Sequence, residues 1–246
     1  MNQQKSSITL ASLIPNIVTL FALCLGSTAI RYSLDLKFET AVSLIVIAAI
    51  IDGLDGRIAR FLNLSSNFGA QLDSLADLVN FGIAPGIAIY IWSLSKIPYR
   101  GIGWAIVLFY IVCSAFRLAR FNAGAVGIHK EKSGPNMLAT FEGVPMPVAA
   151  VLSMMPMMVS FINHDIAIYS NAIAVYVVII AILMVSSMPT PSIKNITINR
   201  NNLPISIALL GAFITAALLE PWIVLPTIGA LYLIALPFFA HYSRKK

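Results

Sequence analysis

Residues 52–77 read DGLDGRIARFLNLSSNFGAQLDSLAD, and this stretch decides how the rest of the chain is interpreted. It holds four carboxylates, Asp52, Asp55, Asp73 and Asp77, although the 246-residue chain has only ten acidic residues and is 59% hydrophobic. Ionisable groups are costly in apolar surroundings, so acids gathered at the ends of apolar segments indicate a functional site, usually one that holds cations. The stretch therefore predicts a cation site at the ends of neighbouring helices.

The composition around this stretch is typical of a polytopic membrane protein. Mean hydropathy is +0.86, and only 11% of the residues are charged. We therefore expect an all-α polytopic membrane protein that forms one integral membrane domain over residues 1–246. Its apolar segments predict eight transmembrane helices, separated by short loops and by two longer polar loops at 124–143 and 188–202. The helices are expected at about 11–33, 38–62, 70–95, 101–124, 144–163, 166–187, 203–219 and 222–242.

The basic residues predict how the chain is oriented. Twelve of the 16 Lys and Arg residues fall on the side of the membrane that holds both termini, and the other four fall on the opposite side. Positive charge gathers in cytoplasmic loops, so both termini and the acidic stretch are expected on the cytoplasmic side. The net charge of +6 is scattered over loops and helix ends. It forms no patch with interleaved aromatic residues, so we expect no nucleic-acid partner.

The spacing of the four acids predicts how they meet. Asp52 and Asp55 are three residues apart and Asp73 and Asp77 four apart, so each pair projects from one face of its helix. Antiparallel neighbouring helices can bring the four carboxylates into one cage, where cations must offset their repulsion. Oxygen ligands without His or Cys favour magnesium, manganese or calcium over zinc, and four acids suit two divalent cations that polarise a phosphoryl group.

Two residues beside the acids suggest a phosphate-containing ligand. Gly56 follows Asp55 directly, and its missing side chain lets a nucleotide or phosphate lie against the helix. The alternative is that Gly56 belongs to a small-residue face that packs against another helix. Arg60 lies eight residues beyond Asp52 and shares the acidic face, where its guanidinium can hold a diphosphate. The alternative for Arg60 is a side chain that extends to the cytoplasmic membrane surface.

The acidic stretch resembles the signature of the CDP-alcohol phosphatidyltransferase family. The matching residues are Asp52, Gly53, Asp55, Gly56, Ala59, Arg60, Gly69, Asp73 and Asp77. The resemblance implies a six-helix catalytic core, here residues 11–187, followed by two additional C-terminal helices at 203–242. It also implies two divalent cations, magnesium or manganese, and transfer of a phosphatidyl group from CDP-diacylglycerol to an alcohol with release of CMP.

The same resemblance implies a role for each site residue. Asp52, Asp55 and Asp73 are expected as metal ligands, and Asp77 as the catalytic base that also touches metal. The CDP portion is expected to contact residues from the first two predicted helices and from the loop between the second and third. These are Asn16, Thr19, Gly56, Arg60, Ser66 and Gly69.

Three further segments resemble the members of this family that use serine as the acceptor. They are residues 74–85, 117–122 and 141–145. L-serine is therefore the expected acceptor, and Arg117 and Arg120, one helical turn apart, are expected to bind its carboxylate or a phosphate with Asn122 as a polar partner. The alternative for the two arginines is again positive charge at the cytoplasmic end of a helix.

Two rival functions remain open at this point. The acceptor could be glycerol 3-phosphate or inositol phosphate, which would demand more basic residues around the acceptor. A cation-coupled transporter would also use buried acids, but it gives no reason for the Asp-Gly and Ala-Arg steps. Membrane lipids are expected partners, a homodimer is common in the family, and the compact loops suit a bacterial inner membrane.

Overall fold

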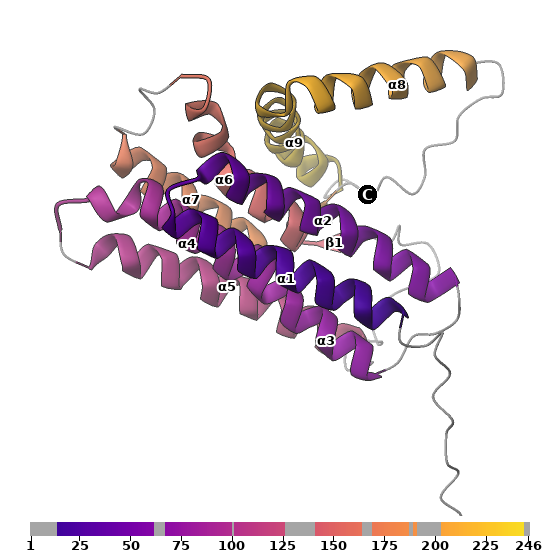
Figure 1. The fold of residues 1–246 in the computed structure, drawn as a ribbon, viewed down its shortest axis with the longest axis horizontal. Helices are drawn as coiled ribbons and strands as arrows, with labels where there is room; N and C mark the ends of the chain where they lie inside the picture. The colour runs from indigo at the N-terminus through magenta and orange to yellow at the C-terminus, as the bar shows by residue number, and fades with distance from the viewer. Residues whose placement is uncertain are drawn as a thin grey trace, which may run out of the picture.

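The computed structural model describes residues 14–61, 67–99, 101–125, 141–163, 169–186, 189–190 and 203–243. The described residues are almost entirely helical, which confirms the predicted all-α class (Figure 1). Each of the eight predicted apolar segments contains a helix, and the third contains two, α3 and α4. The α-helices are α1 (Ile14–Leu34), α2 (Phe38–Phe61), α3 (Asn67–Asp77), α4 (Ala84–Trp92), α5 (Ile102–Ala125), α6 (Met146–Ser160), α7 (Ser170–Val185), α8 (Leu203–Leu219) and α9 (Pro221–Ser243).

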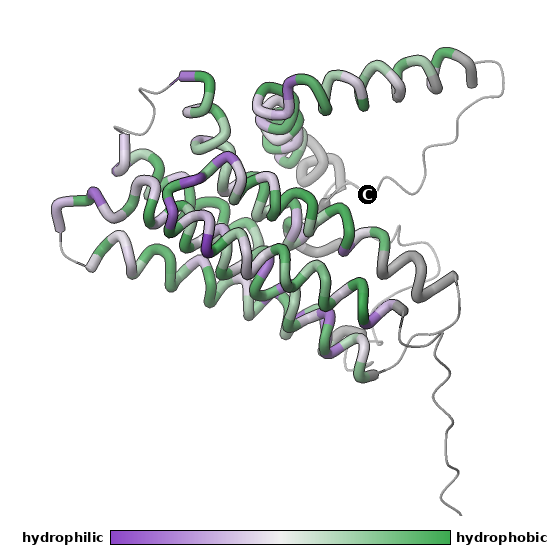
Figure 2. The backbone as a smooth tube through the Cα atoms, viewed as in Figure 1, coloured by the Kyte–Doolittle hydropathy of each residue, from purple (hydrophilic) through white to green (hydrophobic). Residues whose placement is uncertain are grey.

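The outer surface of the helices is apolar, as a lipid environment requires. Figure 2 shows hydrophobic residues along most of the helices, and large apolar side chains such as Phe116, which is 67% exposed, lie on the outside. Such contiguous apolar surface is rare on soluble monomers, so the chain is an integral membrane protein. Within the described part of the chain, Pro15–Leu34, Phe68–Trp92 and Ile102–Ala123 are long and apolar enough to cross a membrane. The number of eight spans stays a prediction.

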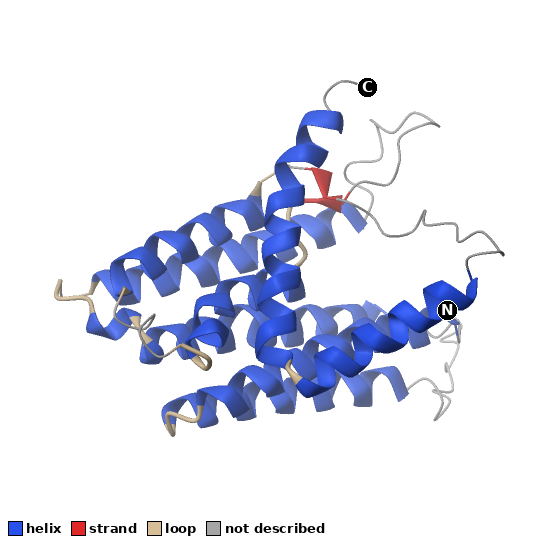
Figure 3. Ribbon diagram, turned by 90° about the horizontal axis from the view of Figure 1, so that it is seen from above, coloured by secondary structure: helices blue, strands red, loops and turns tan. Residues whose placement is uncertain are grey.

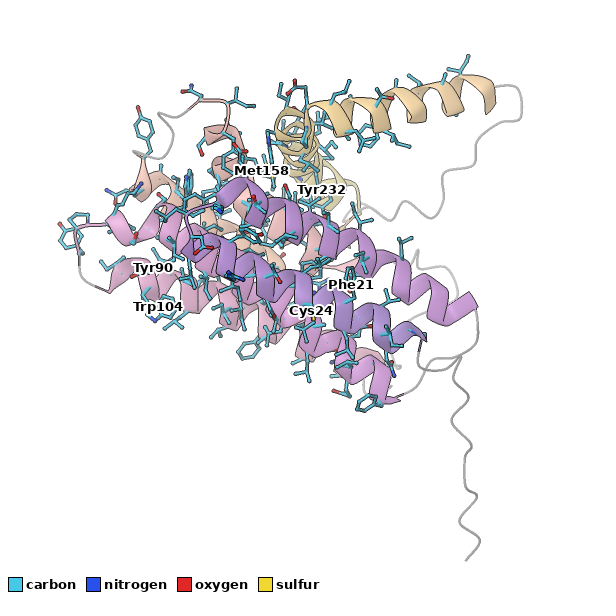
Figure 4. All side chains as sticks on the ribbon, viewed as in Figure 1. Phe21, Cys24, Tyr90, Trp104, Met158 and Tyr232 are labelled. Atoms are coloured by element: carbon cyan, nitrogen blue, oxygen red, sulfur yellow. The ribbon has the colours of Figure 1, made fainter. Side chains whose placement is uncertain are left out.

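The helices pack into a bundle in which α4 contacts α1, α2, α5 and α6. Helix α1 packs against α2, to which a short turn at 33–37 joins it, and also against α3 and α4. Farther along the chain α5 packs on α7, and α6 packs on α9. The Tyr90 ring on α4 meets the Trp104 ring on α5 edge to face, with centroids 5.2 Å apart (Figure 4). Seen from above, α9 crosses the bundle (Figure 3). Helix α8 contacts α9 and stands away from the other helices (Figure 1).

A two-stranded pairing lies where the sequence predicts polar loops. The strands β1 (Phe141–Glu142) and β2 (Pro189–Thr190) are antiparallel, with Phe141 opposite Thr190. The pairing ties the segment before α6 to the segment after α7, and α9 packs against β2. The start of α6 and the end of α7 are thereby held close together.

A π-helical turn interrupts the third apolar segment directly after Asp77. Residues 78–83 are π-helical, and the N–H of Ala84 donates to the carbonyl of Val79, five residues earlier. Pro85 has no N–H, so it cannot donate to the Phe81 carbonyl in the α-helical pattern. The hydroxyl of the fully buried Tyr110 donates to that carbonyl instead, at 3.0 Å. This bond links α5 to the turn that follows the acidic pair.

Helix α1 approaches the π-helical turn closely at Gly26. A Cβ placed on Gly26 would lie 3.0 Å from the Cα of Asn80 and would overlap its side-chain oxygen. Asn80 is 1% exposed and follows Asp77 by three residues. The absent side chain at Gly26 therefore sets how near α1 lies to the segment that carries the acids.

We predict that Gly26→Ala lowers stability by about 1–3 kcal/mol, because the new methyl group must displace backbone as well as side-chain atoms. The measurement is the melting temperature of the purified protein in detergent. Gly211→Ala is the matched control, because a Cβ there meets nothing within 4 Å. The control should melt at the wild-type temperature or slightly above it. Equal melting temperatures for Gly26→Ala and the wild type would contradict the close approach.

Candidate functional site

Three aspartates from two helices meet at one end of the bundle. Asp52 comes from α2, and Asp73 and Asp77 come from α3. All three are partly buried, and one carboxylate oxygen of each lies within 4.8 Å of the others. The three acids lie 21 and 4 residues apart in sequence (73 − 52 and 77 − 73), so the fold brings them together. Helix α1 packs against both α2 and α3 and holds the two carriers in place.

The cluster has the chemistry of a site for a hard divalent cation. The side chains of Asp52 and Asp77 are within hydrogen-bonding reach of each other. Two carboxylates so close repel each other unless a proton or a cation lies between them. The described cluster offers only carboxylate oxygens, with neither His nor Cys, which suits magnesium, manganese or calcium. These residues therefore fit the divalent metal that the family resemblance implies.

The fourth predicted ligand and part of the predicted CDP site lie outside what the structure describes in detail. Asp55, Gly56 and Arg60 lie on helix α2, but their side chains are outside the described residues. Ser66 lies in the segment 62–66, which is also outside them. Their roles as metal or CDP contacts therefore stay predictions.

The other predicted CDP contacts lie on α1 and α3. Thr19 is buried, and its hydroxyl donates to the carbonyl of Pro15 at 3.1 Å. Asn16 is partly buried one turn earlier on α1, which packs against α3. Gly69 lies on α3, four residues before Asp73. The structure thus places Asn16 and Thr19 on a helix that contacts both acid-bearing helices, and Gly69 on one of those two helices.

Two of the predicted acceptor residues approach the acidic helix from α5. The Arg117 guanidinium interacts electrostatically with the Asp77 carboxylate. The Asn122 amide donates to the hydroxyl of Ser74 at 3.0 Å, and Ser74 directly follows Asp73. Helix α5 therefore brings a cation and a polar side chain to the same helix that carries two of the acids.

Arg120 has a contact that the sequence reasoning did not foresee. Its Nη1 donates to the carbonyl of Val185 at 2.8 Å and its Nη2 to that of Ser186 at 3.3 Å. These carbonyls end α7, where a cation offsets the negative end of the helix dipole. Gly143, with φ of +76°, lies beside them, and a Cβ there would approach Arg120 Nη2 to 3.3 Å. Arg120 thus has a structural role in capping α7. Its role in binding serine or phosphate stays a prediction.

Sequence reasoning also missed Asn80, three residues after Asp77, and Tyr232, which interacts with Arg117. Asn80 lies within a segment quoted for its resemblance, but nothing in its spacing marked it as buried beside Asp77. Tyr232 on α9 interacts electrostatically with Arg117. No sequence signal could have found Tyr232, because it lies far beyond the signature in a uniformly apolar segment.

Comparison with known proteins establishes the class of the chain. Residues 12–187 match the family model of the CDP-alcohol phosphatidyltransferases, so the chain belongs to this family. It is 34% identical to the CDP-diacylglycerol–serine O-phosphatidyltransferase of Mycobacterium leprae, over 94% of this chain and 76% of that protein. The enzyme of the same name from Helicobacter pylori is 34% identical, over 90% of this chain and 88% of that protein. The archaetidylserine synthase of Methanothermobacter thermautotrophicus is 31% identical, over 78% and 75% respectively.

We predict that Asp73→Asn removes the stabilisation that a divalent cation gives to the protein. Manganese at about a hundredfold its dissociation constant should stabilise the wild type by about 2.7 kcal/mol, seen as a rise in melting temperature. The variant loses a charged ligand, so the rise should nearly vanish. Asp35→Asn is the control, because this exposed acid lies in the turn between α1 and α2 and should leave the rise intact. An equal rise in both variants would show that the cation binds elsewhere.

We also predict that Arg120→Ala destabilises the protein without any substrate present. Two charge-assisted hydrogen bonds to the end of α7 are lost, which should cost about 2–3 kcal/mol. Arg31→Ala, an exposed arginine near the end of α1, is the matched control and should change stability little. Chemical or thermal unfolding in detergent measures both, and unchanged stability in Arg120→Ala would refute the capping role.

Proposed function

We propose that the protein transfers the phosphatidyl group of CDP-diacylglycerol to the hydroxyl of L-serine, giving phosphatidylserine and CMP. The observation that carries this proposal is the cluster of Asp52, Asp73 and Asp77 within a chain that belongs to the phosphatidyltransferase family. The acceptor is supported by the relatives, which are named for serine, and by the three segments that resemble serine-using members.

The acidic residues would divide the work between holding cations and accepting a proton. Asp52, Asp55 and Asp73 would hold two divalent cations, with Asp77 beside them. When bound, these cations would offset the charge of the diphosphate and polarise the phosphoryl group. Asn16, Thr19, Gly56, Arg60, Ser66 and Gly69 would position the CDP portion. The diphosphate is anionic, so Arg60 would also reduce its repulsion from the carboxylates.

In the chemical step the bonds change at the phosphorus that carries diacylglycerol. Asp77 would accept the proton of the serine hydroxyl while the serine oxygen forms a bond to this phosphorus. The bond between the phosphorus and the bridging oxygen breaks, and CMP leaves with that oxygen. The electrostatic interaction of Arg117 with Asp77 supports this assignment, because it brings the proposed base next to a residue expected to bind the acceptor.

The acceptor contacts would come from α5. Arg117 and Arg120 would bind the serine carboxylate, with Asn122 as a polar partner held by Ser74. The guanidinium of Arg120 already donates to the carbonyls at the end of α7, whereas Arg117 Nε has no hydrogen-bond partner among the described residues. Arg117 would therefore be the more direct ligand of the serine carboxylate. A glycerol 3-phosphate or inositol phosphate acceptor would place a phosphate group, with its larger negative charge, beside these arginines and would demand more basic residues there. Serine places only one carboxylate beside them.

We further propose the arrangement in the cell that the charge pattern predicts. The core over residues 11–187 and the two helices over 203–242 would form one domain in a bacterial inner membrane. Both termini and the site would face the cytoplasm, where serine and CMP are soluble. The apolar outer surface is compatible with lipid contact and with a homodimer in the membrane.

The test is release of CMP by the purified protein with CDP-diacylglycerol and magnesium or manganese. We expect release that depends on L-serine, stops with a chelator, and falls at least a thousandfold in Asp52→Asn, because a metal ligand is lost. The melting temperature without metal checks that the variant is folded. If CMP were released only with glycerol 3-phosphate or inositol phosphate, that compound and not L-serine would be the acceptor. No release with any acceptor would reject the proposal and favour a cation-coupled transporter.

A further inference from the structure

Helix α9 lies outside the stretch that matches the family model, yet it is firmly docked on the core. A Cβ on Gly229 would lie 3.1 Å from Leu152 Cδ2 and 2.5 Å from Met155 Sδ, so α9 and α6 approach closely there. The Trp222 ring meets the Phe161 ring edge to face, with centroids 4.9 Å apart. These contacts fix both the depth and the rotation of α9 against the bundle.

Tyr232 lies on this docked face, three residues after Gly229 (Figure 4). Leu236, one turn farther on, is 4% exposed, which confirms that this face of α9 is buried. The hydroxyl oxygen of Tyr232 is buried and has no hydrogen-bond partner among the described residues. The Nε of Arg117 is also buried and has no hydrogen-bond partner among the described residues. A native protein seldom leaves two such donors unused, so each requires an explanation.

The two groups belong to one site. Tyr232 and Arg117 interact electrostatically, and Arg117 also interacts with Asp77. Arg117 therefore connects the Tyr232 hydroxyl to Asp77, the residue to which the proposed reaction assigns the acceptor proton. The arginine is a cation that offers only donors, and the tyrosine hydroxyl can donate beside it, so together they suit an anionic group and not the ammonium of an amino acid.

We propose that Tyr232 binds the substrate and, together with Arg117, holds the carboxylate of the amino-acid acceptor. This inference rests on the proposed function, which supplies the acceptor. The CDP phosphates are a less suitable ligand, because the residues predicted to hold them come from α1, α2 and α3. The tyrosine and the arginine come from α9 and α5, so the anion that they share belongs to the other substrate.

The test compares the kinetics of Tyr232→Phe with the wild type. Loss of one hydrogen bond to a carboxylate should raise the KM for L-serine about tenfold. The KM for CDP-diacylglycerol and the kcat should stay within about twofold, because the hydroxyl does not touch the CDP-lipid or the reacting atoms. A second readout without turnover is the rise in melting temperature that L-serine gives in the presence of CDP, which the variant should lose.

Tyr176→Phe is the matched control. Its hydroxyl is also on a partly buried tyrosine beside α6, but it donates to the carbonyl of Leu152 at 2.8 Å. The control should lower the melting temperature without changing the KM for L-serine. In a double-mutant cycle, Arg117→Lys and Tyr232→Phe together should raise this KM by less than the product of their separate effects, because both lose the same carboxylate.

Three outcomes would overturn the inference. An unchanged KM for L-serine in Tyr232→Phe would show that the hydroxyl does not contact the acceptor. A rise confined to the KM for CDP-diacylglycerol would assign Tyr232 to the lipid diphosphate. Wild-type protein that releases CMP only with another acceptor would defeat the proposed function itself, and the inference would fall with it. The wild-type acceptor panel thus separates the two failures.

Discussion

Mutual repulsion among the carboxylates of Asp52, Asp73 and Asp77 is the constraint on which the rest of the structure depends. With one oxygen of each inside 4.8 Å, their charges favour separation of α2 from α3 unless cations or protons intervene. The surrounding helices therefore have to be fixed independently of the acids. Close packing does this on one side, where Gly26 lets α1 reach the segment directly after Asp77. A rigid frame of this kind would keep the three carboxylates preorganised for the proposed cations.

The second support is the π-helical turn, which has a chemical cause. Pro85 cannot donate to the Phe81 carbonyl, and Tyr110 from α5 supplies the missing hydrogen. An extra residue in the turn rotates everything that follows it relative to α3. The acids can thus face the site while α4 turns its apolar residues to the core, with Ala84 and Ala88 almost fully buried. In one uninterrupted α-helix, the acidic residues and the buried apolar residues would keep a fixed angular relation; the π-helical turn lets each set face its own surroundings.

The sequence predicted what is encoded locally. Apolar length predicted the helical segments, and the spacing of Asp73 and Asp77 placed both on one face of a helix. It could not predict contacts whose partners lie far apart in the chain. Arg120 meets Val185, and β1 pairs with β2, because the ends of α5 and α7 meet in space; nothing near either residue in sequence indicates this. The π-helical turn was missed for the same reason, since its stabilising hydroxyl comes from another helix.

The residues proposed for the two substrates lie on different helices of the chain. All members of the family share the CDP portion, and the signature that would hold it lies on adjacent helices, α2 and α3. Acceptors differ in charge and size, so the groups that distinguish them cannot belong to that shared stretch. Arg117 lies on α5 and Tyr232 on α9, both later in the chain than this stretch; Arg117 interacts with Asp77, and Tyr232 interacts with Arg117. If Tyr232 binds the acceptor as proposed, a helix outside the matched stretch would take part in acceptor recognition through Arg117 without itself supplying a metal ligand.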